Sequence, residues 1–246
     1  MSFAAKLKGR KAYQSHLQGN QLLDKGQTEK AAEKHKQALA LYEDAYAAGC
    51  RECGVVMAYA VLLMRFGQYE KSRDLLLSCE HMKDLDAKSR KQLYINYSVC
   101  QWRLGNLDKA IELMKTAGSN GMTAMIYTTL GYYLILKAQQ TGDFEEALTF
   151  NMEAYEYDEE DAGVLDNLGQ LYYAKGDADK AYEYFSRAYS AKPTQVPTLY
   201  FIAKINHERG NDEKARAFIQ KCLEGNFSAL CSISREQANA LKDEIG

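Results

Sequence analysis

Apolar residues recur three and four positions apart along most of this chain, and glycines interrupt these helical stretches at regular intervals. Six of these glycines each precede a small residue by five positions, and we call them the marker glycines. The pairs are Gly26/Ala31, Gly67/Ser72, Gly105/Ala110, Gly142/Ala147, Gly176/Ala181 and Gly210/Ala215. A glycine between two helical stretches is typical of a tight turn. The pattern therefore predicts six helical hairpins that cover nearly the whole chain.

Small residues inside the hairpins indicate where two helices cross closely, because only a short side chain lets the backbones approach. In the first helix of a hairpin the small residue is Ala60, Ser98, Gly131, Gly169 or Ala203. In the second helix it is Ala38, Cys79, Ala117, Ala154, Ala188 or Cys222. These positions predict close contacts within and between successive hairpins.

The residue spacing of one hairpin matches a known repeat. Its defining residues are Leu165, Leu168, Gly169, Tyr172, Ala181, Phe185 and Pro193. They fall on the spacings of a 34-residue tetratricopeptide repeat. The chain resembles the tetratricopeptide-repeat family most strongly at residues 162–195 and 196–229, and less strongly toward the N-terminus. The resemblance implies an all-α fold, a right-handed superhelical solenoid of antiparallel helix pairs with a C-terminal capping helix.

We expect one solenoid domain over residues 1–246, because no Pro-rich, Gly-rich or low-complexity stretch suggests a linker. Its units are predicted at about 12–48, 53–82, 91–119, 124–161, 162–195 and 196–229, with a capping helix at about 234–244.

Two units depart from the regular repeat length. The 41 residues from Gly26 to Gly67 predict a lengthened second helix over about 28–48. Eleven residues between Gly131 and Gly142, where the next unit has seven, predict one added helical turn. After the last unit, Ser234 as an N-cap with Gln237 three residues later predicts the capping helix.

Charge and composition limit the possible partners. The chain has 246 residues and a formal net charge of −2, which argues against nucleic-acid or membrane-surface binding. Residues 1–123 hold 19 Lys and Arg against 13 Asp and Glu, whereas residues 124–246 hold 12 against 20. In a linear solenoid these halves would become opposite ends of a dipolar rod.

The cellular setting is predicted from what the sequence lacks. No apolar run approaches the ~18 residues needed to span a bilayer. The N-terminal residues have no apolar stretch typical of a secretory signal. With six Cys in a long helical chain, we expect free thiols in a reducing, cytoplasmic setting.

A binding groove follows from the resemblance, since the first helices of tetratricopeptide units line the concave face of the solenoid. Counting back from each marker glycine gives the residues expected in a partner-binding groove. They are Met57, Val61, Met64, Ile95, Val99, Trp102, Met125, Tyr132, Tyr173 and Tyr200. An exposed apolar patch of this kind is typical of an interaction site, and Met and aromatic side chains suit such contacts. The alternative is that some of these side chains belong to the core between repeats.

A run of acidic residues ends the fourth unit, and we call it the acidic lip. Its members are Glu153, Glu156, Asp158, Glu159, Glu160 and Asp161. Such a run is usually a solvated face that also favours the N-terminus of the next helix. A functional role would be to dock a basic segment. That segment would belong to a partner or to the basic end of another copy, around Lys6, Lys8, Arg10 and Lys11.

The residues predict neither catalysis nor a cofactor, since no base stands at an interpretable spacing from a nucleophile. Cys50 and Cys53 form a closely spaced thiol pair, and Cys79 with His81 would complete four zinc ligands. The second closely spaced half of a zinc motif is missing, so we predict no metal. One family subtype grips chaperone tails by their carboxylates. Asn20 matches one position of that clamp, but the cationic companions are absent.

We therefore predict a non-enzymatic adaptor or scaffold that binds a peptide or helix of another protein in an apolar concave groove. The first alternative is a self-assembling homo-oligomer, such as a homodimer, that uses the same surface or the charged ends. The second is a metal- or thiol-dependent regulator or enzyme that uses Cys50 and Cys53. We expect neither nucleic acid nor a membrane as a partner.

Overall fold

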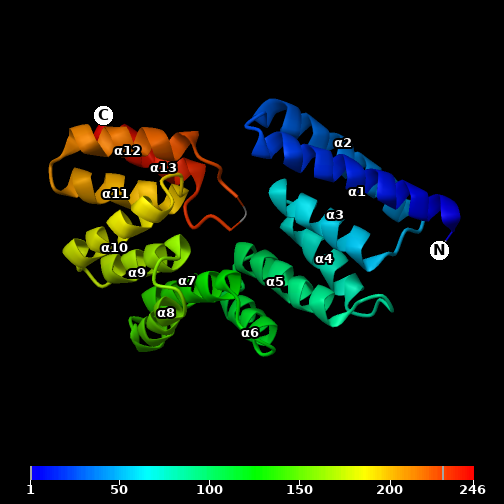
Figure 1. Ribbon diagram of the computed structural model, residues 1–246, viewed down its shortest axis with the longest axis horizontal. Coiled ribbons are helices and arrows are strands. Elements are labelled where there is room, and N and C mark those ends of the chain that lie inside the picture. Colours follow the sequence, from blue (N-terminus) through cyan, green and yellow to red (C-terminus); the bar gives the residue numbers. More distant parts are fainter. Residues whose placement is uncertain (1, 229) are drawn as a thin grey trace. The chain divides into compact units, whose positions relative to one another are not determined.

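The protein is described by a computed structural model over residues 2–228 and 230–246. These residues form thirteen α-helices and no strand (Figure 1). The helices group into two compact units, Met1–Ala117 and Gly118–Gly246, and each unit is described by itself. The prediction of an all-α fold is confirmed, whereas a single domain over residues 1–246 stays a prediction.

The N-terminal unit contains three successive helix pairs. Its helices are α1 (Phe3–Asp24), α2 (Thr28–Ala47), α3 (Cys53–Arg65), α4 (Tyr69–Cys79), α5 (Ala87–Arg103) and α6 (Leu107–Gly118). α1 packs on α2 and α3 packs on α4, while α3 also contacts α1, α2 and α5. Each first helix is thus covered by the first helix of the next pair, as in a repeat solenoid.

The C-terminal unit repeats this arrangement and adds a closing helix. Its helices are α7 (Ala124–Thr141), α8 (Glu145–Tyr157), α9 (Ala162–Ala174), α10 (Ala178–Ala191), α11 (Val196–Glu208), α12 (Asp212–Glu224) and α13 (Arg235–Ile245). The pairs are α7 with α8, α9 with α10, and α11 with α12. The first helices α7, α9 and α11 contact one another in that order and form one surface.

The marker glycines stand at the turns of the hairpins. All six adopt left-handed backbone conformations, with φ between 70° and 84°. At Gly176, for example, φ is +84°, a value that an L-residue with a side chain adopts only with strain. This requirement explains why glycine, and not another small residue, occupies the turn.

Close helix crossings occur where the sequence predicted them. The predicted small positions are all buried, and they are Ala38, Ala60, Cys79, Ser98, Ala117, Gly131, Ala154, Gly169, Ala188, Ala203 and Cys222. A Cβ atom added at Gly169 would lie 2.6 Å from ring carbons of Phe185, and one added at Gly131 would lie 2.4 Å from Asn151 Oδ1. These approaches leave no room for a side chain, so the glycines set the helix–helix distance.

Gly19 makes the same kind of crossing in the first pair, although the sequence analysis did not single it out. A Cβ atom at Gly19 would lie 2.4 Å from the ring of His35. Gly19 precedes Gly26 by seven residues, the offset that also separates Gly169 from Gly176. This seven-residue offset is the sequence signal that predicts the close crossing at Gly19.

The lengths of three helices bear on the predicted departures from the repeat. α2 spans 20 residues, close to the expected 28–48, and α7 spans 18 residues against 13 in α9. α1 begins at Phe3, earlier than the predicted start at about residue 12. Its earlier start is supported by Ser2, whose side-chain oxygen accepts a hydrogen bond from the Ala5 amide at 3.2 Å.

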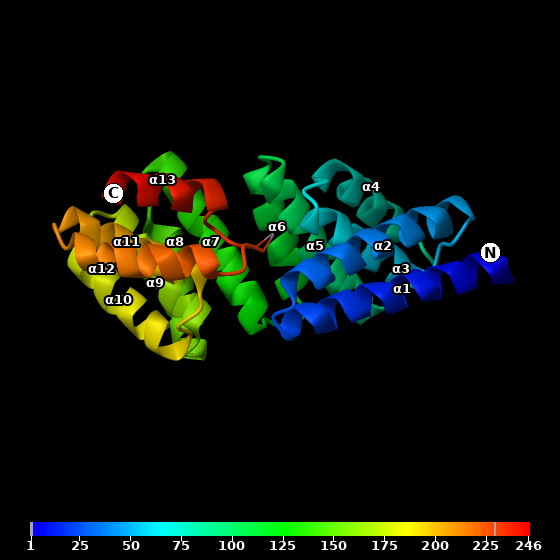
Figure 2. The ribbon, with the colours of Figure 1, turned by 90° about the horizontal axis from the view of Figure 1, so that it is seen from above.

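Helix α13 closes the C-terminal unit by packing on α11 and α12 (Figure 2). The capping box that the sequence predicted is present: the Ser234 hydroxyl accepts from the Gln237 amide, and the Gln237 side chain accepts from the Ser234 amide. Ala238, Leu241 and Ile245 are buried against the last hairpin. The helix therefore covers an apolar face that would otherwise contact water.

Among the described residues, no helix combines the length and apolar character that a membrane crossing requires.

Candidate functional site

The inner surface of the C-terminal unit contains a cavity of about 260 Å³. Three successive first helices, α7, α9 and α11, form most of its wall, and the segment before α13 closes one side. The lining residues are Tyr132, Ile135, Leu136, Gln139, Gln170, Tyr173, Tyr200, Phe201, Lys204, Ser232, Ile233 and Gln237. The cavity thus combines aromatic and aliphatic walls with several amide and hydroxyl groups.

Three of the predicted groove residues meet in this cavity. Tyr132 on α7, Tyr173 on α9 and Tyr200 on α11 all line it, and all three are half-buried. They come from equivalent first helices of three successive pairs, which explains how an offset from the marker glycine brings them together. Half-buried aromatic side chains in a concave surface are typical of contact residues.

A buried carboxyl group lies beneath the cavity. Asp166 is 4% exposed, and its two oxygens accept hydrogen bonds of 2.6 Å from the Thr198 hydroxyl and from Gln170 Nε2. Burial raises the pKa of Asp166 to about 6, although both hydrogen bonds favour its charged form. Gln170 Nε2 also lies 3.2 Å from the Ser232 hydroxyl. The floor of the cavity is therefore polar, and Gln170 links it to the closing segment.

The rim of the cavity carries a cation beside aromatic rings. The Lys204 ammonium lies 5.3 Å from the centre of the Tyr173 ring. The Tyr173 hydroxyl donates a hydrogen bond to Glu208. Burial and this carboxylate both raise the pKa of Tyr173, so the hydroxyl stays neutral. Lys204 supplies the cationic group among the lining residues.

Sequence analysis missed the segment that closes the cavity. Cys231 and Ile233 are buried in the core of the last hairpin, and Ser232 between them lines the cavity. The available signal was two apolar residues separated by one polar residue, just before the predicted N-cap at Ser234. That alternation is typical of an extended segment with one side buried.

In the N-terminal unit, four predicted groove residues lie in the interior instead of on a surface. Met57, Met64, Ile95 and Val99 are each at most 9% exposed. α3 is packed between α1 and α5, so inward side chains of these helices are covered by the neighbouring pair. The structure gives these four residues a packing role, and a binding role for them stays a prediction.

The other three predicted groove residues lie apart from the cavity. Val61 is exposed on α3, and Trp102 is half-buried with the Arg103 guanidinium 4.2 Å from its ring centre. Met125 is 48% exposed on α7 but does not line the cavity. The structure therefore brings together Tyr132, Tyr173 and Tyr200 from the predicted set.

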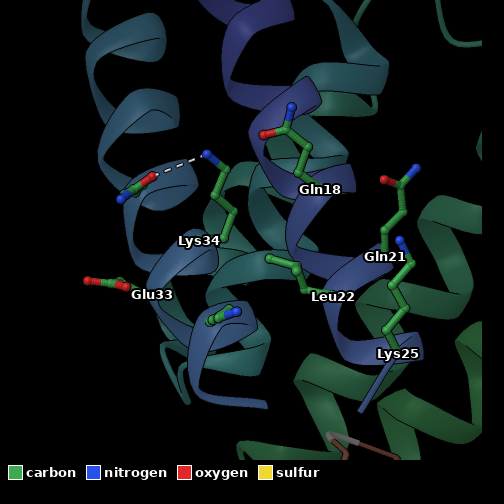
Figure 3. Close-up of a pocket in the computed structure, with 8 residues that line it drawn as sticks. Gln18, Gln21, Leu22, Lys25, Glu33 and Lys34 are labelled. Carbon is green, nitrogen blue, oxygen red and sulfur yellow. Dashed lines mark hydrogen bonds between the residues drawn. The ribbon is translucent and has the colours of Figure 1, made fainter. Parts of the chain in front are cut away.

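The first helix pair carries a second hollow surface, between α1 and α2, which we call the lysine groove (Figure 3). Two adjoining cavities of about 400 and 600 Å³ share Gln18, Lys34 and Gln37 in their linings. The groove residues are Lys11, Gln14, Ser15, Gln18, Gln21, Leu22, Lys25, Lys30, Glu33, Lys34, Gln37, Ala40, Leu41 and Asp44. Of these residues the sequence singled out only Lys11, as part of the basic end of the chain.

Two histidines are buried beneath the inner face of the first pair. The His16 ring lies 3.2 Å from the Tyr42 hydroxyl, and His35 lies 3.0 Å from both Asn20 Oδ1 and the Arg65 guanidinium. The pKa of each histidine is lowered to about 4, mainly by burial, and the charge of Arg65 contributes to the shift. Both rings are therefore neutral near pH 7. His16 and His35 are thus both core residues of the first pair.

The cysteine residues do not form the four-ligand zinc site that was considered as an alternative. All six thiols are free and buried. Cys53 forms a hydrogen bond with the Cys79 thiol, and burial raises the pKa of both, which disfavours reactive thiolate. Cys50 packs instead on Ala5 and Ala45. Within residues 2–228 and 230–246, no three metal-binding side chains are grouped so as to hold an ion.

The acidic lip lies at the end of α8 and in the turn that follows. Glu153, Glu156, Asp158, Glu159 and Glu160 are exposed. Asp161 has a structural role: its carboxylate accepts hydrogen bonds from the Gly163 and Val164 amides and so caps the N-terminus of α9. Five of the six carboxylates are thus exposed to solvent.

Comparison with known proteins identifies the repeats. Models of the tetratricopeptide repeat match residues 91–117, 162–195 and 196–225. The Photosystem I assembly protein Ycf3 of Rippkaea orientalis is 31% identical over 99 residues, in a match that covers 36% of this chain and 57% of that protein. The chain therefore matches little more than half the length of this curated relative.

Solved structures share the fold at low sequence identity. A tetratricopeptide repeat protein of Parabacteroides merdae superposes with a TM-score of 0.69 at 12% identity, covering 96% of this chain and 99% of that one. A thermophilic tetratricopeptide repeat protein of Thermus thermophilus gives a TM-score of 0.64 at 18% identity, covering 79% and 98%. Such repeats indicate a protein-interaction or assembly role in general. With these matches and its paired helices, the chain contains tetratricopeptide repeats at residues 91–117, 162–195 and 196–225.

Proposed function

We propose that this protein is a non-enzymatic scaffold whose C-terminal unit binds a peptide segment of another protein in the cavity of α7, α9 and α11. The proposal rests on one observation: Tyr132, Tyr173 and Tyr200 line the same cavity. Tyrosine offers a large contact area and a polar hydroxyl at a small entropic cost, which favours it in binding sites.

The size of the cavity supports a side chain as its occupant. Small-molecule sites usually enclose about 300 to 1,000 Å³, whereas this cavity measures about 260 Å³. It therefore suits one or two apolar side chains of a peptide better than a cofactor. Gln139 and Lys204 line the same cavity and offer N–H donors to the carbonyl groups that flank such an anchor.

The test is a comparison of variants with partners captured from the native cell lysate. Each captured protein is purified, and its affinity for the full chain is measured by calorimetry. Tyr132→Ser/Tyr200→Ser should raise the dissociation constant by about 30-fold or more, because truncating a central aromatic contact costs about 2 kcal/mol or more. Tyr13→Ser/Tyr69→Ser changes two tyrosines outside the cavity and should leave the affinity unchanged.

The outcome also locates the site. All variants should retain the helical circular dichroism spectrum of the wild type. Unchanged affinity in Tyr132→Ser/Tyr200→Ser would exclude the cavity as the binding site. If Trp102→Ser alone abolished binding, the site would instead lie in the N-terminal unit.

A further inference from the structure

The lysine groove of α1 and α2 carries positive charge that the protein does not neutralise. Lys11, Lys25, Lys30 and Lys34 line it, against the carboxylates of Glu33 and Asp44. In the part of the chain that the structure describes, none of these four lysines has an ion-pair partner. The Lys34 ammonium reaches only the Gln37 amide oxygen, at 3.4 Å (Figure 3).

The structure corrects the basic surface expected from the sequence. Lys6 was expected at the basic end of the chain, but its ammonium forms an ion pair of 2.8 Å with Glu52. The unpaired lysines that surround a hollow are instead those between α1 and α2. Lys8 and Arg10 of the predicted basic end are exposed, and Lys11 lines the groove, so the positive surface that surrounds a hollow lies between α1 and α2.

The groove lies on a face of the first pair that α3 does not use. Contacts with α3 are made by Asn20 and His35, which meet Arg65, and by Tyr42, which stacks on Tyr59 with ring centres 5.4 Å apart. None of these residues lines the groove. The groove is thus unpartnered within the N-terminal unit, and its glutamines and lysines face outward.

The acidic lip is the complementary surface on the same chain. Glu153, Glu156, Asp158, Glu159 and Glu160 are exposed within eight residues, and Tyr157 among them is 58% exposed. No ion pair involves these five carboxylates in the described residues. A lysine-rich groove and an acidic segment with one exposed aromatic ring match in charge.

The groove is long enough to hold the whole acidic lip. From Lys11 to Lys25 it follows α1 for about 21 Å at 1.5 Å per residue. Residues 153–157 of the lip belong to α8 and span about 6 Å, and the three residues after them extend at most about 11 Å. Leu22 and Leu41 provide apolar surface in the groove for the ring of Tyr157, and the glutamines provide N–H donors for carboxylates.

We propose that the lysine groove binds the acidic lip, residues 153–160, of a second copy of this chain. Each copy carries both surfaces, so the contact is head-to-tail and forms either a closed ring or an open chain of copies. This self-association is independent of the peptide site proposed above, because no residue is shared between the groove and the cavity of the C-terminal unit.

The first test is the solution mass of the full chain by light scattering over a range of concentrations. At about 0.05 M salt the mean mass should rise above the 27.8 kDa of one chain as concentration increases. At about 0.5 M salt, where the Debye length is only about 4 Å, it should return to that of one chain. A constant mass of 27.8 kDa at low salt would overturn the proposal.

Charge reversal then locates the contact. Lys25→Glu/Lys30→Glu/Lys34→Glu should weaken association at least about tenfold. A matched control, Lys8→Glu/Lys83→Glu/Lys88→Glu, changes three exposed lysines outside the groove by the same total charge and should associate like the wild type. Equal weakening in both triple variants would show an effect of net charge alone and would contradict the proposal.

A mixing experiment distinguishes this pairing from binding of another acidic protein. Glu156→Lys/Glu159→Lys/Glu160→Lys reverses the lip, and this variant should also fail to associate by itself. Mixed with the groove variant, it should restore association, because its intact groove meets the intact lip of the groove variant and the two reversed surfaces also match in charge. If the mixture stays monomeric while each variant retains its helical spectrum, the groove does not bind the lip.

Discussion

The contact between Gly169 and Phe185 makes a prediction about stability that depends on two residues at once. A Cβ atom at Gly169 would lie 2.6, 2.6 and 2.8 Å from three ring carbons of Phe185. That ring is fully buried and stacked on Phe201 with ring centres 5.1 Å apart, so it has little room to move. Forcing an extra carbon into a packed core costs about 1 to 3 kcal/mol.

Helix propensity acts in the opposite direction. Replacing a mid-helix glycine by alanine favours the helix by about 1 kcal/mol. Gly169→Ala should therefore destabilise the protein by up to about 2 kcal/mol. In the background of Phe185→Leu, which removes the crowding ring atoms, the same change should become stabilising by up to about 1 kcal/mol. The expected coupling between the two sites is thus about 1 to 3 kcal/mol.

The assay is urea unfolding followed by far-ultraviolet circular dichroism for the wild type, both single variants and the double variant. Gly54→Ala is the matched control, because a Cβ atom at this glycine of α3 meets no atom within 4 Å. It should be neutral or slightly stabilising. Equal effects of Gly169→Ala in both backgrounds would refute the argument, since the steric contact would then contribute nothing.

Three further predictions concern titration and capping. Burial raises the pKa of Asp166 from 3.8 to about 6, so the folded state holds the proton more tightly, and about 3 kcal/mol of stability should be lost as pH rises between these values. In Asp166→Asn this part of the pH dependence of the urea midpoint should disappear, and an unchanged slope would contradict the assignment. Burial, followed by the charge of Arg65, lowers the pKa of His35 from 6.5 to about 4. Its contribution to stability is therefore present above pH 6.5 and lost toward pH 4, and His35→Gln should flatten the acid limb of the same titration. Ser234→Ala removes the N-cap of α13 and should cost about 1 kcal/mol in urea unfolding, whereas Ser228→Ala, outside the cap, should cost little.

The hairpins could be predicted from sequence because their determinants are local. A left-handed turn such as that at Gly176 requires glycine, and a close crossing such as that at Gly169 requires the absence of a side chain. The turn glycine recurs in all six hairpins, and a small residue recurs at the crossing position in most of them. The early start of α1 lacks a large apolar signal, because Phe3 and Leu7 are exposed and the buried face of its first turns consists of the small residues Ala5, Gly9 and Ala12.

The candidate site could be predicted only in part, because exposure depends on neighbours far away in the sequence. Tyr132 and Tyr200 each lie ten residues before a marker glycine, Tyr173 lies three residues before its own, and the three do meet in a cavity. Met57 and Ile95 were assigned by the same counting, yet the packing of α3 against α1 and α5 buries them. Counting along a helix gives the direction of a side chain but not the distance to the next helix pair.

The closing segment shows how one short stretch can serve both the fold and the site. Cys231 and Ile233 are buried in the core beside Leu199 and Cys222, and Ser232 and Ile233 both line the cavity. Ser232 is held there by the same burial that attaches the segment to the last hairpin, so its hydroxyl keeps a fixed position near Gln170. The cavity therefore has one wall that no repeat supplies. The repeat positions in the sequence predict Tyr132, Tyr173 and Tyr200. The wall at Ser232 lies outside the repeats, and its position depends on the burial of Cys231 and Ile233.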